Sequence, residues 1–184
     1  MEESSRQPGL ATTGPSSLLG TFGAAWGLVG VVVLLGSAIL RLTPVAAAAI
    51  GDGLSRLQLV LLVAWVIFMA WSEGYRGFQR AFSPRVVVRA MHLARHPQPL
   101  HVLLAPLFCM SLFHASRRRL IASWVLLFAI LVLVLAVKKL QQPWRGIVDA
   151  GVVVGLGWGL VSLLVFLLRA LSGRPPRVPA DLPY

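Results

Sequence analysis

Hydrophobic and polar positions are segregated along this chain into long blocks. Eighteen consecutive residues, 120–137, carry no charge, and mostly apolar blocks also cover residues 18–40, 57–73 and 147–169. Wound as helices, blocks of about 20 apolar residues match the roughly 30 Å hydrocarbon core of a bilayer. Because a segment in lipid must satisfy its own backbone hydrogen bonds, the pattern predicts four transmembrane helices.

A fifth apolar stretch, residues 100–115, is shorter and is interrupted by Pro106. As a helix it would extend only about 24 Å, so it is either re-entrant or a fifth span. If the chain has four spans, twelve basic residues lie on the cytoplasmic side of the membrane and five on the other side. If it has five spans, the numbers are nine and eight. The positive-inside rule therefore favours four full spans with both termini in the cytoplasm.

Ser83-Pro84 is typical of a helix start, with the hydroxyl as cap and the proline in the first turn. Over residues 84–96, helical spacing separates a basic face from an apolar face. Such a helix lies in the headgroup plane of an anionic leaflet. A short soluble helix packed on the bundle is the alternative. The predicted lipid contacts are Arg85, Arg89, His92, Arg95 and His96.

Together these elements predict an all-α, polytopic transmembrane helix bundle: four full spans, one short hydrophobic helix and one amphipathic interfacial helix. Residues 1–17 are predicted to form a disordered tail, 18–171 the membrane domain and 172–184 a proline-rich tail. Charged residues make up only 12% of the chain, against roughly 25% in soluble domains. We therefore expect no separate soluble domain within these 184 residues.

Two spans carry glycines four residues apart, a spacing that lets helix backbones approach closely. The first span has Gly23 and Gly27, and the last has Gly151, Gly155 and Gly159. We expect these two helices to pack together through their glycine faces. Homodimerisation is the alternative use of such faces, and glycine is also simply common in membrane helices.

Acidic residues at the edges of apolar helices have basic neighbours at helical spacing. Glu73 precedes Arg76 by three residues, and Arg145 precedes Asp149 by four, so each pair can form on one helix face. With four spans we expect the two pairs to be separated by the bilayer thickness. They are interpreted as interfacial anchors, with an ion or proton relay as the alternative.

The composition indicates few specific ligands. The net charge of +11 favours anionic membrane lipids as partners, because no nucleic-acid motif accompanies it. His92 and His96 have the spacing of two metal ligands, but the chain has too few carboxylates nearby to complete a site. No metal, cofactor or catalytic residue is predicted.

The leading functional hypothesis is a non-enzymatic membrane protein with a role in assembly or lipid contact, as a homo-oligomer or with a membrane protein partner. A subunit of a small transporter or channel, and a membrane enzyme acting on lipid, are the alternatives. Fifteen arginines against two lysines are typical of GC-rich bacterial genes, which indicates a multi-pass protein of a bacterial inner (plasma) membrane.

Overall fold

The computed structural model describes residues 17–182, and these residues form helices without any strand. The predicted disordered tail lies outside this range apart from Ser17. The Ser17 hydroxyl accepts a hydrogen bond from the Gly20 amide and so caps the first helix. The predicted all-α class is confirmed.

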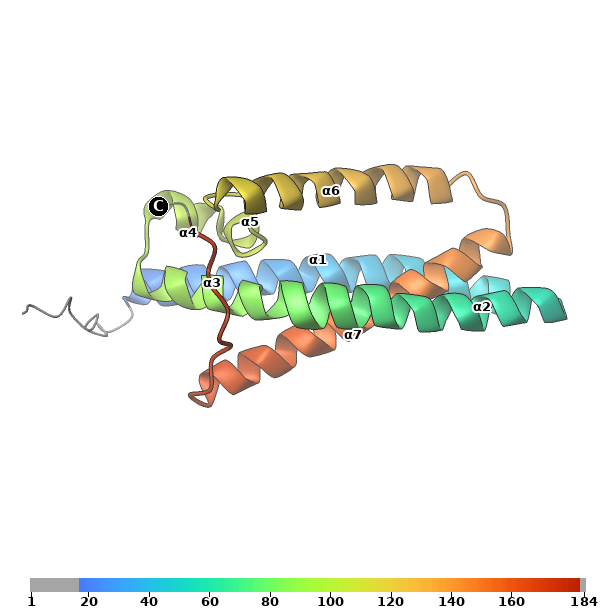
Figure 1. Ribbon diagram of the computed structural model, residues 1–184, viewed down its shortest axis with the longest axis horizontal. Helices are drawn as coiled ribbons and strands as arrows, with labels where there is room; N and C mark the ends of the chain where they lie inside the picture. The colour runs from blue at the N-terminus through green and yellow to red at the C-terminus, as the bar shows by residue number, and fades with distance from the viewer. Residues whose placement is uncertain (1–16, 183–184) are drawn as a thin grey trace, which may run out of the picture.

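Four helical segments are long and apolar enough to cross a membrane, which confirms the predicted number of full spans (Figure 1). The chain is therefore a multi-pass membrane protein. The segments are α1 (Leu18–Gly51), the continuous helix Arg56–Arg95, α6 (Arg117–Val137) and α7 (Trp144–Leu171).

The second segment joins two elements that the sequence predicted to be separate. Residues Arg56–Met69 form α2, Ala70–Phe82 form the π-helical η1, and Ser83–Arg95 form α3 without a break. The prediction of a helix start at Ser83-Pro84 is wrong. Pro84 lies where the π-helical pattern returns to an α-helix, and a first turn tolerates its missing N–H group. The Ser83 hydroxyl instead donates a hydrogen bond to the Gly159 carbonyl oxygen of α7.

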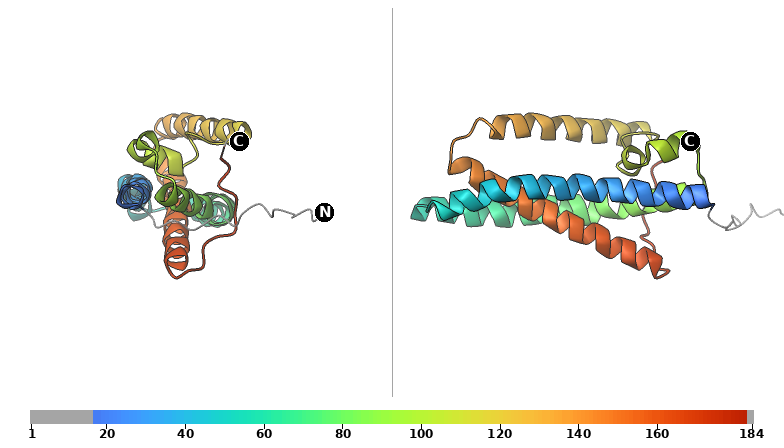
Figure 2. Two further views of the ribbon diagram at one scale, coloured as in Figure 1. Left: turned by 90° about the vertical axis from the view of Figure 1, so that its left-hand side faces the viewer. Right: turned by 180° about the vertical axis from the view of Figure 1, so that it is seen from behind.

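The short hydrophobic stretch does not span the bundle. It folds into α4 (Pro99–Leu103) and α5 (Ala105–Cys109), of five residues each. Proline cannot continue a preceding helix, and Pro106 stands in the first turn of α5. Both helices lie at the end of the bundle where α1 begins and α3 ends, and the chain after α7 returns to that same end (Figures 1 and 2).

The glycine face of α1 packs against the short helices. A Cβ added at Gly23 would lie 2.9 Å from the Val102 side chain, and one at Gly27 would lie 2.7 Å from the Cys109 sulfur. The bare backbone of α1 thus admits α4 and α5 at close range. These contacts border the main core, which contains Val31, Leu35, Val86, Val87, Ala90, Leu93, Val102, Ala105, Phe108, Cys109 and Leu163.

The glycine face of α7 receives bulky side chains from α2 and η1. The contacts pair Gly151 with Trp65, Gly155 with Glu73 and Gly159 with Phe78. Both glycine faces are therefore occupied within one chain. The alternative of pairing two copies through them is not supported, because a second helix could not reach them.

The predicted packing of the first span against the last is confirmed, because α1 and α7 contact one another. The glycines that suggested it face other elements, and a close approach of the two helices is instead at Gly146, where an added Cβ would clash with Ala49. Helices pack by placing the ridge of one into the groove of the other. A glycine face is a groove, and it packs better against bulky side chains than against a second groove.

Helix α6 stands apart from the other three spans (Figure 1). None of its 21 residues is buried, and Phe128 is 68% exposed. Its start is attached through Trp124, whose indole N–H donates a hydrogen bond to the Leu112 carbonyl oxygen at 3.2 Å. A helix that is apolar on all sides is compatible with lipid around its whole circumference.

Candidate functional site

Most of the positive charge gathers where α3, α6 and α7 meet the short helices. We call this region the basic end. It carries nine arginines, two more lie on η1 near the middle of the Arg56–Arg95 helix, and five basic residues lie toward the opposite end of the bundle. The nine are Arg85, Arg89, Arg95, Arg117, Arg118, Arg119, Arg169, Arg174 and Arg177, and the two on η1 are Arg76 and Arg80.

Arg89 of α3 is the polar centre of the basic end. Its side chain is completely buried, and its guanidinium lies 4.2 Å from the centre of the Phe108 ring. The planar guanidinium can satisfy several acceptors at once. It donates hydrogen bonds to the backbone carbonyl oxygens of Phe108, Phe113, His114 and Ala180.

The prediction that Arg89 contacts lipid headgroups is wrong, because the residue has no exposed surface. Helical spacing placed it correctly on the polar side of α3. That side is covered by the irregular turn after α5 and by the chain after α7, whose carbonyl oxygens replace water. Among the other predicted lipid contacts, Arg95 and His96 are exposed, while Arg85 and His92 are partly buried.

The proline-rich tail lies across the basic end. The Arg85 Nε lies 3.3 Å from an Asp181 carboxylate oxygen, and the Ser116 amide donates to the Asp181 carbonyl oxygen at 2.8 Å. Leu182 packs against the main core. Sequence reasoning missed this attachment. Its one signal was that Asp181 is the only acidic residue after Asp149.

The four histidines form two pairs. The ring centres of His101 and His114 lie 4.4 Å apart, and those of His92 and His96 lie 4.9 Å apart. Burial lowers the pKa of His101, and the neighbouring His114 and Arg89 lower it further, so this ring stays neutral at pH 7. Within residues 17–182 no group of three histidine, cysteine or acidic side chains could hold a metal ion.

Six of the arginines at the basic end are exposed. Arg117 and Arg118 are the first two residues of α6, where the helix dipole is already positive and the first turn contains no acid. The six are Arg95, Arg117, Arg118, Arg169, Arg174 and Arg177. In the described part of the chain, the ion pairs are Arg85–Asp181 and Arg145–Asp149, so none of the six has an acidic partner there.

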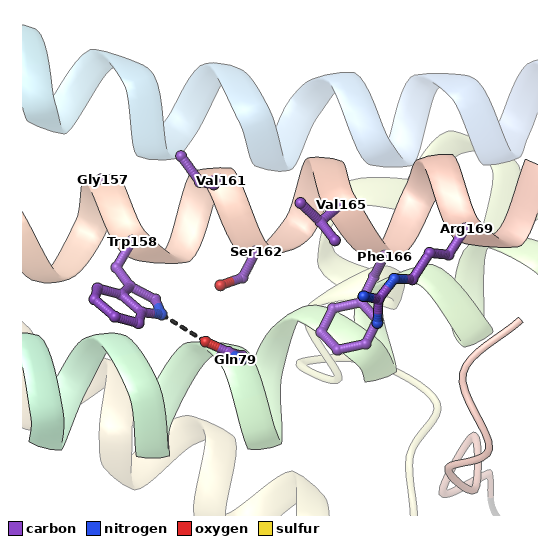
Figure 3. A pocket seen from close by; sticks show the side chains of 8 residues that line it. All are labelled: Gln79, Gly157, Trp158, Val161, Ser162, Val165, Phe166 and Arg169. Atoms are coloured by element: carbon purple, nitrogen blue, oxygen red, sulfur yellow. Dashed lines mark hydrogen bonds between the residues drawn. The ribbon is translucent and has the colours of Figure 1, made fainter.

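A groove runs between η1 and α7 toward the basic end (Figure 3). Near one end the Trp158 indole N–H donates to the Gln79 side-chain oxygen at 2.7 Å, and Arg169 lies at the other end. The wall between them is mostly apolar and is formed by Gly157, Val161, Ser162, Val165 and Phe166. A charged end next to an apolar wall suits an amphipathic molecule.

The two predicted acid–base pairs behave differently. Arg145 and Asp149 lie 3.7 Å apart on one face of α7, with the Asp149 side chain almost entirely buried. Glu73 and Arg76 do not pair, because the Arg76 guanidinium lies over the Trp71 ring at 5.1 Å. A π-helix has more residues per turn than an α-helix, so two residues three apart are separated by a larger angle about the helix axis.

The expected separation of these pairs by the full bilayer thickness is also wrong. Glu73 contacts α7 at Gly155, only six residues after Asp149. Six helical residues correspond to about 9 Å. The structure does not bring the four residues into one cluster, and it packs Glu73 against the middle of α7.

No protein family model, curated protein or solved structure matches this chain.

Proposed function

We propose that this protein is a non-enzymatic integral membrane protein that binds anionic phospholipids at its basic end. The observation that carries the proposal is the set of six exposed arginines at that end without an acidic partner among the described residues. Charge of this kind beside a membrane attracts anionic headgroups, with about 1 kcal/mol of binding free energy per basic residue.

The groove between η1 and α7 supports the same function. Its apolar wall is suited to an acyl chain, and the Arg169 guanidinium at its end can bind a phosphate group through two parallel hydrogen bonds. The groove opens on the outside of the bundle, where lipid can enter sideways. Arg169 is exposed and therefore accessible to a headgroup.

The proposed location is the inner membrane of a bacterium, with the basic end in the cytoplasmic leaflet. Nine of the sixteen described basic residues gather at that end and five lie toward the other, and the positive-inside rule assigns the richer end to the cytoplasm. Both the start of α1 and the chain after α7 lie there (Figure 2). The high ratio of arginine to lysine supports a bacterial source.

Helix α6 favours a second role, assembly with another membrane helix. None of its residues is buried in this chain, so its entire apolar surface is open to a partner or to a second copy. Disulfide crosslinking of single cysteines placed along α6 tests this role. We expect crosslinked dimers, and the absence of any crosslinked product would limit α6 to contact with lipid.

The lipid proposal is tested with purified full-length protein and an equal mixture of anionic phosphatidylglycerol and zwitterionic phosphatidylcholine. Native mass spectrometry counts the bound lipids of each kind. The variant Arg117→Gln/Arg118→Gln should lose about 2 kcal/mol of preference for the anionic lipid.

Lys138 and Lys139 provide the matched control, because they are exposed at the other end of the same helix. Replacing both by glutamine should alter the lipid preference much less. Equal binding of the two lipids by the unaltered protein would contradict the proposal, and so would equal losses in the two variants.

A further inference from the structure

The carboxyl group of Glu73 has no part in the proposed lipid site, because it lies neither in the groove nor at the basic end. It belongs to η1, within the second membrane-spanning helix, and faces α7. Its Oε2 atom is buried and has no hydrogen-bond partner in residues 17–182. A Cβ added at Gly155 would lie 2.7 Å from this oxygen, so the carboxyl group rests directly against the backbone of α7.

The contact lies deep in the bundle. Gly155 is the twelfth of the 28 residues of α7, so it lies near the middle of the last span. At 1.5 Å per residue it is about 16 Å from the first residue of that helix. A polar residue at this depth is costly and therefore marks a functional position more often than an anchor.

Within residues 17–182, no basic side chain forms an ion pair with Glu73. On η1, the Arg76 guanidinium lies over the Trp71 ring and the Arg80 guanidinium over the Tyr75 ring. On α7, the nearest ionisable residues along the helix are Asp149, six residues before Gly155, and Arg169, fourteen after it.

Asp149 pairs with Arg145, and Arg169 lies at the far end of the groove. An isolated carboxylate in an apolar medium is so costly that the group takes up a proton instead. A metal ion would need further ligands, and the described residues offer no group of three.

We propose that Glu73 is a proton-binding site inside the membrane, held as a neutral carboxylic acid at neutral pH. The tight packing of η1 against α7 continues at the next residue. Gly74 packs against Trp158, where a Cβ would lie 2.9 Å from the indole side chain.

Dicyclohexylcarbodiimide tests this site, because it enters membranes and reacts with protonated carboxyl groups. The acid adds across one C=N bond, its proton goes to nitrogen, and the product rearranges to a stable N-acylurea. With full-length protein in liposomes at pH 7, peptide mass spectrometry should find the adduct on Glu73. It should be absent from Glu73→Gln. Asp149 should be labelled less than Glu73, because Arg145 lies 3.7 Å from its carboxylate and favours the unreactive ionised form.

The pH and sodium dependence distinguish a proton from another cation. Labelling of Glu73 should fall as the pH rises, because only the acid form reacts. Labelling that is absent at pH 7, or that does not change with pH, would overturn the proposal. Protection by sodium ions at constant pH would also overturn it, because the site would then bind a metal cation.

A pair of glycine variants tests the geometry without altering the carboxyl group. In Gly155→Ala the new methyl group would collide with Oε2 and displace the carboxyl group from its buried position, so labelling at pH 7 should fall. Gly36→Ala is the control, since nothing lies within 4 Å of a Cβ there and the residue lies in the first span, outside the groove. Unchanged labelling in Gly155→Ala, or an equal fall in both, would contradict the proposed site.

Discussion

The two ends of the bundle are held together by different interactions. At the end opposite the arginines, the apolar residues Ala46, Leu62, Ile147 and Ala150 pack together, and the Arg145–Asp149 ion pair is local to α7. At the basic end a buried arginine connects segments far apart in sequence. Packing of regular helices is sufficient for one end, whereas the other needs a cation to satisfy the carbonyl groups of irregular chain.

The largest expected effect is therefore on Arg89. Replacing it by methionine preserves apolar volume but leaves four carbonyl acceptors without their donor. We expect a loss of roughly 3–5 kcal/mol in the free energy of unfolding, measured by thermal denaturation in detergent. Arg89→Lys should recover only part of it, because an ammonium group cannot reproduce the planar fork.

Arg145→Met is the matched variant at the opposite end. This side chain is 34% exposed and has one carboxylate partner, so the loss should be clearly smaller. Equal destabilisation by the two substitutions would contradict the difference between the ends.

The region between the ends depends on the glycine face of α7. Gly155→Leu places a branched side chain against Glu73 and should cost about 1–3 kcal/mol through overpacking. Gly157→Leu points into open space and should change stability by less than about 0.5 kcal/mol. The measurement is thermal stability in both detergent and lipid. Similar stabilities for the two variants would remove the case for a tight contact between α7 and η1.

The smallest expected effect concerns the attachment of the tail. Arg85 and Asp181 are each 26% exposed, so their pairing should contribute about 0.2–1 kcal/mol. A double-mutant cycle with alanine at both positions measures the coupling. High salt should weaken it by screening. A coupling above that range would mean that the ion pair, rather than Arg89, organises the basic end.

The sequence predicted the spans because lipid imposes a simple length requirement. An apolar run such as 120–137 must be helical, and its uniform hydrophobicity agrees with the complete exposure of α6. The division of basic residues also predicted that the stretch 100–115 would not span. These features depend on local composition, which can be read along a single segment.

Features that depend on distant contacts were not predictable. The burial of Arg89 requires carbonyl groups up to 91 residues away, so its own segment looks like an ordinary amphipathic helix. The absence of a Glu73–Arg76 pair depends on the π-helical conformation of η1, which no local sequence pattern predicted. The glycine spacing identified packing faces, but spacing alone does not say which neighbour fills a groove.

Sided cysteine labelling tests the central claim most directly, namely that the basic end faces the cytoplasm. Arg118→Cys and Lys139→Cys place reactive thiols at the two ends of α6, both at exposed positions. The native Cys109 should remain unlabelled, because burial raises the pKa of its thiol to about 12 and keeps it from forming the reactive thiolate.

Intact bacterial cells expressing each variant are treated with a membrane-impermeant maleimide, and the labelling is repeated after the membrane is opened. We expect Lys139→Cys to react in intact cells and Arg118→Cys to react only after opening. Reaction of Arg118→Cys in intact cells, or labelling of both variants from one side, would contradict the orientation on which the lipid-binding role rests.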